Sequence, residues 1–395
     1  MLATLVGLLC LLAVTRAHAA PQNIKGLGSQ DALLVLDPTG QVVFSHNPDR
    51  PMVPASTLKV LTSLAAFHYL GADYRFPTDF FLDADHNLVI KGYGDPLLIS
   101  EIIAPLAREL AVRLPSEIHD ILLDGTYFEG PQTMPGVSTS TNPYDAPIGA
   151  LCANFNTVFF THADGRLQSA EEQTPLLPMV AERIRRSGLK EGRIVLSPDQ
   201  DEPTRYVGQL FRYFLEREGV VVRGEVRLVT NPVSGASLVY RQLSPYRLPQ
   251  VVQRLLEYSN NFTANQLLMA MGAWCYGPPA TLDKGVRALT AYARDVVGVQ
   301  QGVFVEGSGI SRRNRLSVRD MALILSHFRP HFHLMTSKNR EFYKTGTLKG
   351  VRTRVGYIEV QSGQFYSFAL FRNRPGSTTD PVMRQVHRAL SAHSP

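Results

Sequence analysis

Three short sequence patterns carry side chains that are suited to nucleophilic catalysis. The first is the run from Ser56 to Lys59 (STLK), at the start of a predicted helix from Ser56 to Leu70. A serine three residues before a lysine lies on the same helix face, so a neutral lysine amine could accept the hydroxyl proton. Such a lysine must be buried or lie near another positive charge, because either one lowers its pKa. A serine after Pro-Ala is also a good helix N-cap, so this pattern alone leaves both roles open.

Two further patterns lie much farther along the chain. Residues 259–261 read SNN, and residues 344–347 read KTGT at the start of a stretch with alternating β character. A glycine on an edge strand lets a substrate backbone approach closely. The S-x-x-K pattern recurs at Ser187–Lys190, and S-x-N recurs at Ser45, Ser140 and Ser337, whereas K-T-G occurs once. The ordered combination of all three is therefore far more specific than any one of them.

This combination resembles the D-alanyl-D-alanine carboxypeptidases and endopeptidases of the penicillin-binding-protein-4 type. The resemblance covers nearly all of the mature chain and includes an excursion of about 200 residues between Ser56 and Ser259, where this family inserts extra domains. The excursion is short for the family, which predicts that one inserted module is reduced or missing. Further stretches that carry the resemblance are Gly94–Leu97 (GDPL), Asn261–Leu268 (NFTANQLL), Gly307–Arg312 (GSGISR), Val351–Thr353 (VRT) and Gly356–Tyr357.

The resemblance implies a role in bond cleavage for three residues. Ser56 would attack the carbonyl carbon of the penultimate D-alanine and form an acyl-enzyme, with release of the terminal D-alanine. Lys59 would be the base for that attack, and Ser259 would relay the proton between the lysine and the leaving amine. Water would then hydrolyse the ester.

The resemblance also implies how substrate would be held. Asn261 would bind the substrate amide, and Lys344 would keep the local field positive and attract the substrate carboxylate. The hydroxyl groups of Thr345 and Thr347 could bind the same carboxylate, on either side of Gly346. The backbone N–H groups of Ser56 and Thr347 would form the oxyanion hole.

Two positions depart from the family pattern, since Asn260 and Glu306 stand where aspartate is usual. Three other functions stay open. A β-lactamase has the same nucleophile but needs a dedicated deacylation base, and the chain has no separate E-x-x-L-N motif. A non-catalytic cell-wall-binding or scaffolding protein is favoured only by Asn260. A general esterase on the same fold uses the same chemistry.

The implied partners are peptidoglycan stem peptides that end in D-Ala-D-Ala, with β-lactam antibiotics as covalent inhibitors. A content of 44% hydrophobic and 19% charged residues is typical of a globular enzyme. The net charge of +6 is not gathered into a basic cluster, which argues against nucleic-acid binding. His331 and His333 resemble a pair of metal ligands, but without a third ligand a structural role is favoured. We therefore expect no metal and no other cofactor.

The N-terminus resembles a secretory signal peptide, residues 1–19. Leu5–Val14 is apolar but too short to span a bilayer, and Ala17–Ala19 (AHA) forms a small-x-small cleavage site. No other stretch is apolar enough for a transmembrane anchor, which predicts an exported, periplasmic protein that is soluble or loosely associated with the membrane or wall. Cys152 and Cys275 then remain, either as a disulfide or as two buried free thiols.

The hydrophobic patterns predict an α/β (α+β) fold. Two β segments near the start, Asp31–Leu36 and Gln41–Phe44, and two near the end, Arg354–Val360 and Phe365–Phe371, indicate one sheet built from both chain ends. By resemblance this is a penicillin-binding-protein/β-lactamase-like transpeptidase domain, in which helices flank an antiparallel sheet and a helical subdomain is added. We assign residues 20–73 and 243–395 to this discontinuous domain and residues 74–242 to a β-rich inserted domain.

Overall fold

Both ends of the chain contribute to one antiparallel sheet in the computed structural model, which describes residues 24–130, 132–138, 140, 142–197, 201–229 and 235–392. The expected signal peptide lies outside these residues. The strand order is β13-β14-β15-β16-β1-β2, and β1 pairs with β16 so that Leu34 lies opposite Ala369. The prediction of one sheet from both chain ends is confirmed. The strands are β1 (Asp31–Leu36), β2 (Val42–His46), β13 (Thr336–Lys338), β14 (Glu341–Leu348), β15 (Val351–Gln361) and β16 (Gln364–Arg372).

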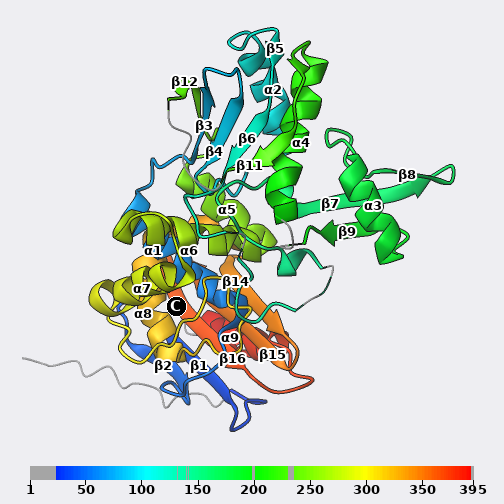
Figure 1. Cartoon of the computed structure of the whole chain (residues 1–395). Helices are drawn as coiled ribbons and strands as arrows, with labels where there is room; N and C mark the ends of the chain where they lie inside the picture. Colours follow the sequence, from blue (N-terminus) through cyan, green and yellow to red (C-terminus); the bar gives the residue numbers. More distant parts are fainter. Residues whose placement is uncertain are drawn as a thin grey trace, which may run out of the picture.

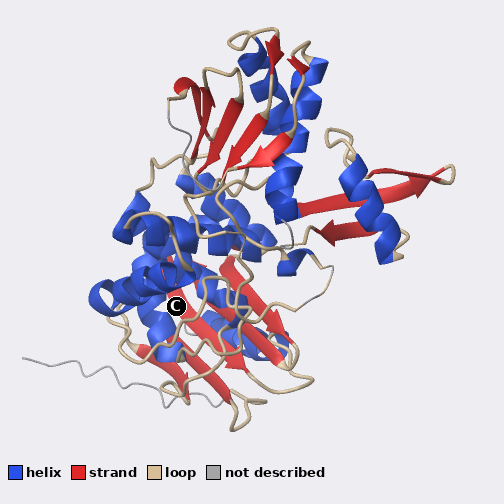
Figure 2. Cartoon of the chain, in the orientation of Figure 1, coloured by secondary structure: helices blue, strands red, loops and turns tan. Residues whose placement is uncertain are grey.

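Helices cover both faces of this sheet (Figures 1 and 2). Alternate residues of a strand point to opposite faces, so Leu34 lies in the core under the main group of helices, while Leu33 lies in a smaller core under α9. The main group contains α1 at its centre, with Leu61 fully buried. The helices are α1 (Lys59–Leu70), α5 (Leu248–Tyr258), α6 (Asn261–Tyr276), α7 (Leu282–Tyr292), α8 (Val318–Phe328) and α9 (Asp380–Ala392), with a π-helical turn at Ala293–Val297 and a 3-10 turn at Arg329–Leu334.

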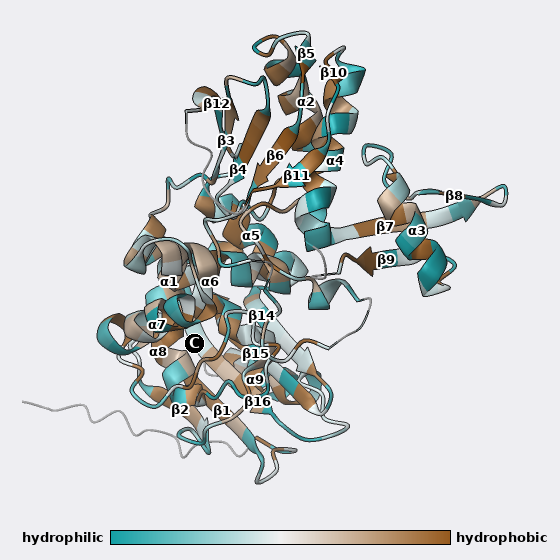
Figure 3. Ribbon diagram, viewed as in Figure 1, coloured by the Kyte–Doolittle hydropathy of each residue, from teal (hydrophilic) through white to brown (hydrophobic). Residues whose placement is uncertain are grey.

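The middle of the chain forms a second body with its own hydrophobic core (Figure 1). Its main sheet has the order β11-β6-β4-β3-β12 and packs against α2 and α4. The strands of this sheet are mostly apolar, whereas α4 shows a polar outer side (Figure 3). The elements are β3 (Pro77–Leu82), β4 (Leu88–Gly92), β6 (Ile121–Asp124), β11 (Val226–Leu228), β12 (Ser237–Leu243), α2 (Ser100–Ala111) and α4 (Glu202–Arg217).

A smaller sheet projects from this body, with the order β8-β7-β9 and one helix, α3. The sequence patterns did not predict α3, because only three of its residues are buried and most of the others are charged or polar. The main sheet is also mixed, since β4 and β6 pair in parallel. The remaining elements are β5 (Glu117–Ile118), β7 (Thr157–Ala163), β8 (Arg166–Ser169), β9 (Gly192–Val195), β10 (Val221–Val222) and α3 (Pro178–Ser187).

Cys152 and Cys275 do not form a disulfide in the structure. Cys152 is buried and Cys275 is partly buried, and both are free thiols. Burial raises the pKa of Cys152 to about 12, so this thiol stays protonated at neutral pH. Within the described residues, no helix is long and apolar enough to cross a membrane.

A buried ion pair joins the two chain ends. Asp31 in β1 accepts hydrogen bonds from the Arg372 guanidinium of β16, with an Nη2–Oδ2 distance of 2.9 Å, and both side chains are almost fully buried. Burial alone would raise the pKa of Asp31, but hydrogen bonds from Arg372, the Gly28 N–H and Arg374 lower it overall. The carboxylate is therefore held charged inside the fold.

Replacement of Asp31 by asparagine should lower the free energy of unfolding by about 3–5 kcal/mol at pH 7, because Arg372 keeps a buried charge without its partner. Since the folded-state pKa of Asp31 lies below the ordinary value of 3.8, the difference should persist at neutral pH and shrink as the pH falls through that lowered pKa. Urea unfolding at several pH values measures it.

Asp49→Asn is the matched control, because Asp49 pairs with Arg319 at an exposed site. This change should leave the free energy of unfolding nearly unchanged. Equal effects of the two substitutions would contradict the assigned role of the buried pair.

Candidate active site

Ser56 lies in a 3-10 turn, Ala55–Leu58, that precedes α1. The sequence predicted an α-helix from Ser56, but the α-helix begins at Lys59, and neither helical segment has a side-chain cap hydrogen bond at its start. Thr57 takes the local backbone contact, since its Oγ1 donates to the Pro54 carbonyl at 2.6 Å. The capping role that the sequence left open for Ser56 is therefore not observed, and its hydroxyl is available to Lys59.

The amine of Lys59 is completely buried and lies among three oxygen atoms. Its Nζ is 3.0 Å from Ser56 Oγ, 2.7 Å from Asn261 Oδ1 and 2.7 Å from the Ser308 carbonyl oxygen. Burial and, to a lesser extent, the charge of Lys344 hold the pKa of Lys59 well below its usual value, although Glu306 acts in the opposite direction. The predicted serine–lysine pair is thus in contact.

The second and third patterns meet beside this pair. Lys344 Nζ donates to Ser259 Oγ at 2.8 Å and to the Thr345 carbonyl at 2.9 Å. Burial lowers the pKa of Lys344 to about 8. Ser259 has a left-handed backbone conformation, φ +54°, in the turn between α5 and α6. The hydrogen bonds therefore form two groups, Lys59 with Ser56 and Asn261 and Lys344 with Ser259. Side chains from both groups line the same groove.

Asn260 caps the helix that carries Asn261. Its Oδ1 accepts the Thr263 N–H at 3.0 Å at the N-terminus of α6. Asparagine and aspartate are both strong N-caps because each offers a side-chain oxygen to this donor. Asparagine at residue 260, where the family pattern has aspartate, therefore still supplies a capping oxygen at this turn.

A buried carboxylate orders the loop that supplies the Ser308 carbonyl. Glu306 is fully buried and accepts hydrogen bonds from the backbone N–H groups of Ser308 (2.6 Å), Gly309 (2.8 Å) and Ser311 (3.3 Å). Asn314 Nδ2 donates to it as well, at 2.6 Å. A charged acceptor with several donors holds backbone firmly, because each broken bond would leave a buried polar group unpaired. The sequence pattern marked Glu306 only as a departure from the family.

Two glycines let this loop and β14 approach the Ser56 turn. A Cβ on Gly309, where φ is +85°, would lie 1.9 Å from the Ala55 carbonyl oxygen. A Cβ on Gly346 would lie 2.3 Å from Thr353 Oγ1 and 2.9 Å from the Ser56 nitrogen. Among the described residues, β13 pairs with β14 only at residues 341–343, so the KTGT segment has no strand partner on that side.

A groove of about 800 Å³ runs along side chains of both hydrogen-bonded groups. Ser56, Ser259, Asn261 and Thr347 line it, whereas Thr345 does not, although its side chain is exposed. The groove is also lined by residues to which the sequence patterns gave no role. These are Gly136, Ser138, Tyr144, Asp145, Ile310, Ser311, Arg312, Arg313, Leu348, Lys349 and Arg352.

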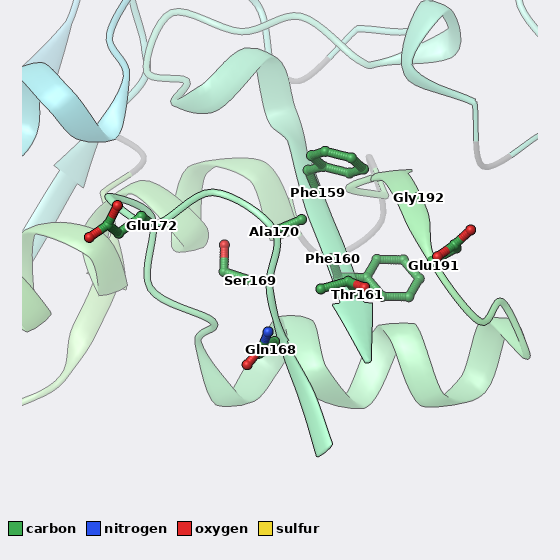
Figure 4. A pocket seen from close by; sticks show the side chains of 9 residues that line it. All are labelled: Phe159, Phe160, Thr161, Gln168, Ser169, Ala170, Glu172, Glu191 and Gly192. Carbon is green, nitrogen blue, oxygen red and sulfur yellow. The ribbon is translucent and has the colours of Figure 1, made fainter. Parts of the chain in front are cut away.

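A second hollow, of about 670 Å³, lies against the small projecting sheet (Figure 4). Its two carboxylate side chains, Glu172 and Glu191, lie at opposite sides of the hollow (Figure 4). It contains none of the predicted site residues. The repeated S-x-x-K pattern lies in the same projecting module, where the Ser187 hydroxyl donates to the Ile184 carbonyl at the end of α3.

No group of three histidine, cysteine, aspartate or glutamate side chains within the described ranges is arranged to hold a metal ion. His331 instead stacks on Phe67, with ring centroids 4.5 Å apart. A serine hydroxyl in contact with a buried amine, as at Ser56 and Lys59, is an arrangement that is suited to acyl transfer.

The chain belongs to the D-Ala-D-Ala carboxypeptidase 3 (S13) family, which it matches over residues 22–183 and 191–337. It is 26% identical over 338 residues to a D-alanyl-D-alanine carboxypeptidase of Actinomadura sp.. The aligned region covers 73% of this chain but only 62% of that relative. It is 24% identical over 418 residues to the D-alanyl-D-alanine carboxypeptidase DacB of Haemophilus influenzae, with coverage of 88% and 86%. The family resemblance seen in the motifs is confirmed.

Solved structures share the fold. Penicillin binding protein 4 from Haemophilus influenzae superposes with a TM-score of 0.74 at 20% identity, covering 91% of this chain and 96% of that one. A predatory peptidoglycan endopeptidase from Bdellovibrio bacteriovorus gives a TM-score of 0.52 at 16% identity, with 91% of each chain covered. The predicted fold class is therefore confirmed.

Replacement of Gly309 by alanine should slow acylation of Ser56 by penicillin about 100-fold, because the new Cβ must push the Ala55 carbonyl and with it the Ser56 turn. Gly298→Ala is the control, since Gly298 also has a positive φ, +89°, but has no atom within 4 Å of the added Cβ. It should cost about 1 kcal/mol of stability and leave acylation unchanged. Equal acylation rates in the two variants would refute the steric argument.

Proposed function

We propose that this chain is a serine D-Ala-D-Ala carboxypeptidase that cleaves peptidoglycan stem peptides through an acyl-enzyme on Ser56. The observation that carries the proposal is the 3.0 Å contact between Ser56 Oγ and the buried amine of Lys59. The family match and the names of the relatives support the same activity.

Lys59 would act as the base in its neutral form. A neutral amine has two N–H bonds and one lone pair, whereas its ammonium form has three N–H bonds and no lone pair. With two N–H groups donated to Asn261 Oδ1 and the Ser308 carbonyl, the lone pair is left for the Ser56 hydroxyl. The proton would move from Ser56 Oγ to Lys59 Nζ as the Oγ–C bond forms.

Ser259 and Lys344 would complete the reaction. When the C–N bond of the substrate breaks, the leaving amine takes a proton, which Ser259 would relay from Lys59. The positive charge of Lys344 favours neutral Lys59 and attracts the substrate carboxylate. Thr347 lines the groove and is suited to bind that carboxylate, whereas Thr345 does not line the groove. Water would then attack the ester and restore Ser56.

The oxyanion hole would consist of the backbone N–H groups of Ser56 and Thr347. The residue before Thr347, Gly346, lies against the Ser56 turn so closely that a Cβ there would be 2.9 Å from the Ser56 nitrogen, which brings the two segments together. Each such donor typically contributes a factor of about 10²–10³ in rate. Asn261, which also donates to the Tyr144 carbonyl at 3.4 Å, would hold the substrate amide.

We also propose domain boundaries, a cellular location and a class of inhibitor. Residues 20–73 and 243–395 would form the catalytic domain, and residues 74–242 would form an inserted domain. The protein would be exported to the periplasm, and β-lactam antibiotics would acylate it. A penicillin G acylated structure of a Bdellovibrio bacteriovorus endopeptidase with the same fold supports the last point.

The test is to incubate the mature chain with a labelled penicillin and follow the adduct by mass spectrometry. We expect a long-lived adduct on Ser56 that is absent in Ser56→Ala, because the Ser56 hydroxyl is the one in contact with the Lys59 amine. The same preparation should release D-alanine from a stem pentapeptide, and Ser56→Ala should release none.

The alternatives predict other results. Rapid turnover of penicillin would identify a β-lactamase, and the absence of any adduct would favour a wall-binding or scaffolding protein. An adduct without D-alanine release would contradict the proposed peptidase activity and favour a general esterase.

A further inference from the structure

A separate hollow of about 390 Å³ lies next to the catalytic groove, on the other side of the α5–α6 turn. Asn260 lines this hollow, while its neighbours Ser259 and Asn261 line the groove. The same division occurs in the facing turn, where Pro143 lines the hollow and Tyr144 lines the groove. These two turns therefore lie between the two spaces.

The walls of the hollow are aromatic. Phe155, Tyr246 and Tyr258 all contribute to the lining. Tyr258 is 68% exposed, so the hollow is open to solvent on that side. Its volume is within the range of small-ligand sites, which are mostly apolar with a few polar groups that fix orientation.

Two charged side chains, Arg193 and Arg254, are found among the described residues that line this hollow. Of the two, Arg254 has no charged partner within the described ranges. Its guanidinium stacks on the Tyr246 ring, 4.7 Å from the centroid, and makes a long hydrogen bond of 3.5 Å to the Tyr246 hydroxyl. The other arginine of the hollow, Arg193, is instead paired with Glu171 and also donates to Thr157 Oγ1. No aspartate or glutamate is found among the residues that line this hollow in the described part of the chain. The electrostatic environment therefore favours an anion at Arg254.

We propose that this hollow is a second binding site, for a sugar ring that carries a carboxylate. The C–H face of a sugar ring can pack by dispersion against Tyr258, which is largely exposed, while the Tyr246 ring holds the Arg254 guanidinium in place. A planar guanidinium held by a ring is suited to bind a carboxylate with two hydrogen bonds.

The choice of a sugar acid rests on the proposed function. The glycan strand of the cell wall contains muramic acid, whose lactyl carboxyl is free wherever the stem peptide has been removed. A hollow that adjoins the groove for the stem peptide is within reach of the same polymer. Occupancy would bring the ligand against Asn260, between the two groove residues Ser259 and Asn261.

The test is a calorimetric titration of the full mature chain with N-acetylmuramic acid. We expect saturable binding, which should be at least about tenfold weaker for N-acetylglucosamine, the ring without the carboxylate, and for D-lactate, the carboxylate without the ring. Arg254→Gln should weaken binding of N-acetylmuramic acid by at least about tenfold, since it removes a charged hydrogen-bond donor.

Arg287→Gln is the matched control, because Arg287 stacks on Tyr276 at 4.4 Å in the same manner but does not line the hollow. It should bind the probe as the parent does. The inference would be overturned by a titration that does not saturate, or by N-acetylglucosamine or D-lactate binding as tightly as N-acetylmuramic acid. It would also be overturned if Arg254→Gln bound N-acetylmuramic acid with the affinity of the parent. Penicillin acylation is measured on the same samples, so that an acylating protein that does not bind the sugar acid refutes this site and leaves the proposed function intact.

Discussion

The burial of one amine, that of Lys59, is the constraint on which the rest of the site depends. Removing a lysine from water disfavours its charged form, and oxygen atoms around the amine then decide where its hydrogen atoms and lone pair point. Those oxygens come from three separate segments: the turn of Ser56, the start of α6 at Asn261, and the loop at Ser308. The site exists only while these segments remain packed together.

Each segment is held by its own physical device. Glu306 binds the backbone of the Ser308 loop, Asn260 caps α6, and the absence of a side chain at Gly346 lets β14 reach the Ser56 turn. In the sheet beneath them, the buried ion pair of Asp31 with Arg372 links β1 to its neighbour β16. The geometry of the candidate site and the stability of the whole fold therefore rest on different contacts, and substitutions should affect them separately.

The sequence predicted the sheet and the contacting side chains well, because strand alternation and the three motifs are local signals. It missed what depends on long-range packing or on backbone atoms. The carbonyl of Ser308 has no side-chain signature, and the 3-10 turn at Ser56 lies against Gly309, a residue far away in the sequence. Helix α3 buries too few apolar residues to show a clear period. The hollow at Arg254 combines residues from distant parts of the chain, which only the fold brings together.

The protonation state of Lys59 tests the account most directly. Lysine side chains labelled with ¹³C at Cε report it by NMR titration, with the Lys59 signal assigned from Lys59→Arg. We predict that Lys59 loses its proton well below the ordinary pKa of 10.5. Lys344→Gln should raise the pKa of Lys59, because it removes a neighbouring positive charge. A Lys59 that titrates near 10.5, with no response to Lys344→Gln, would contradict the account.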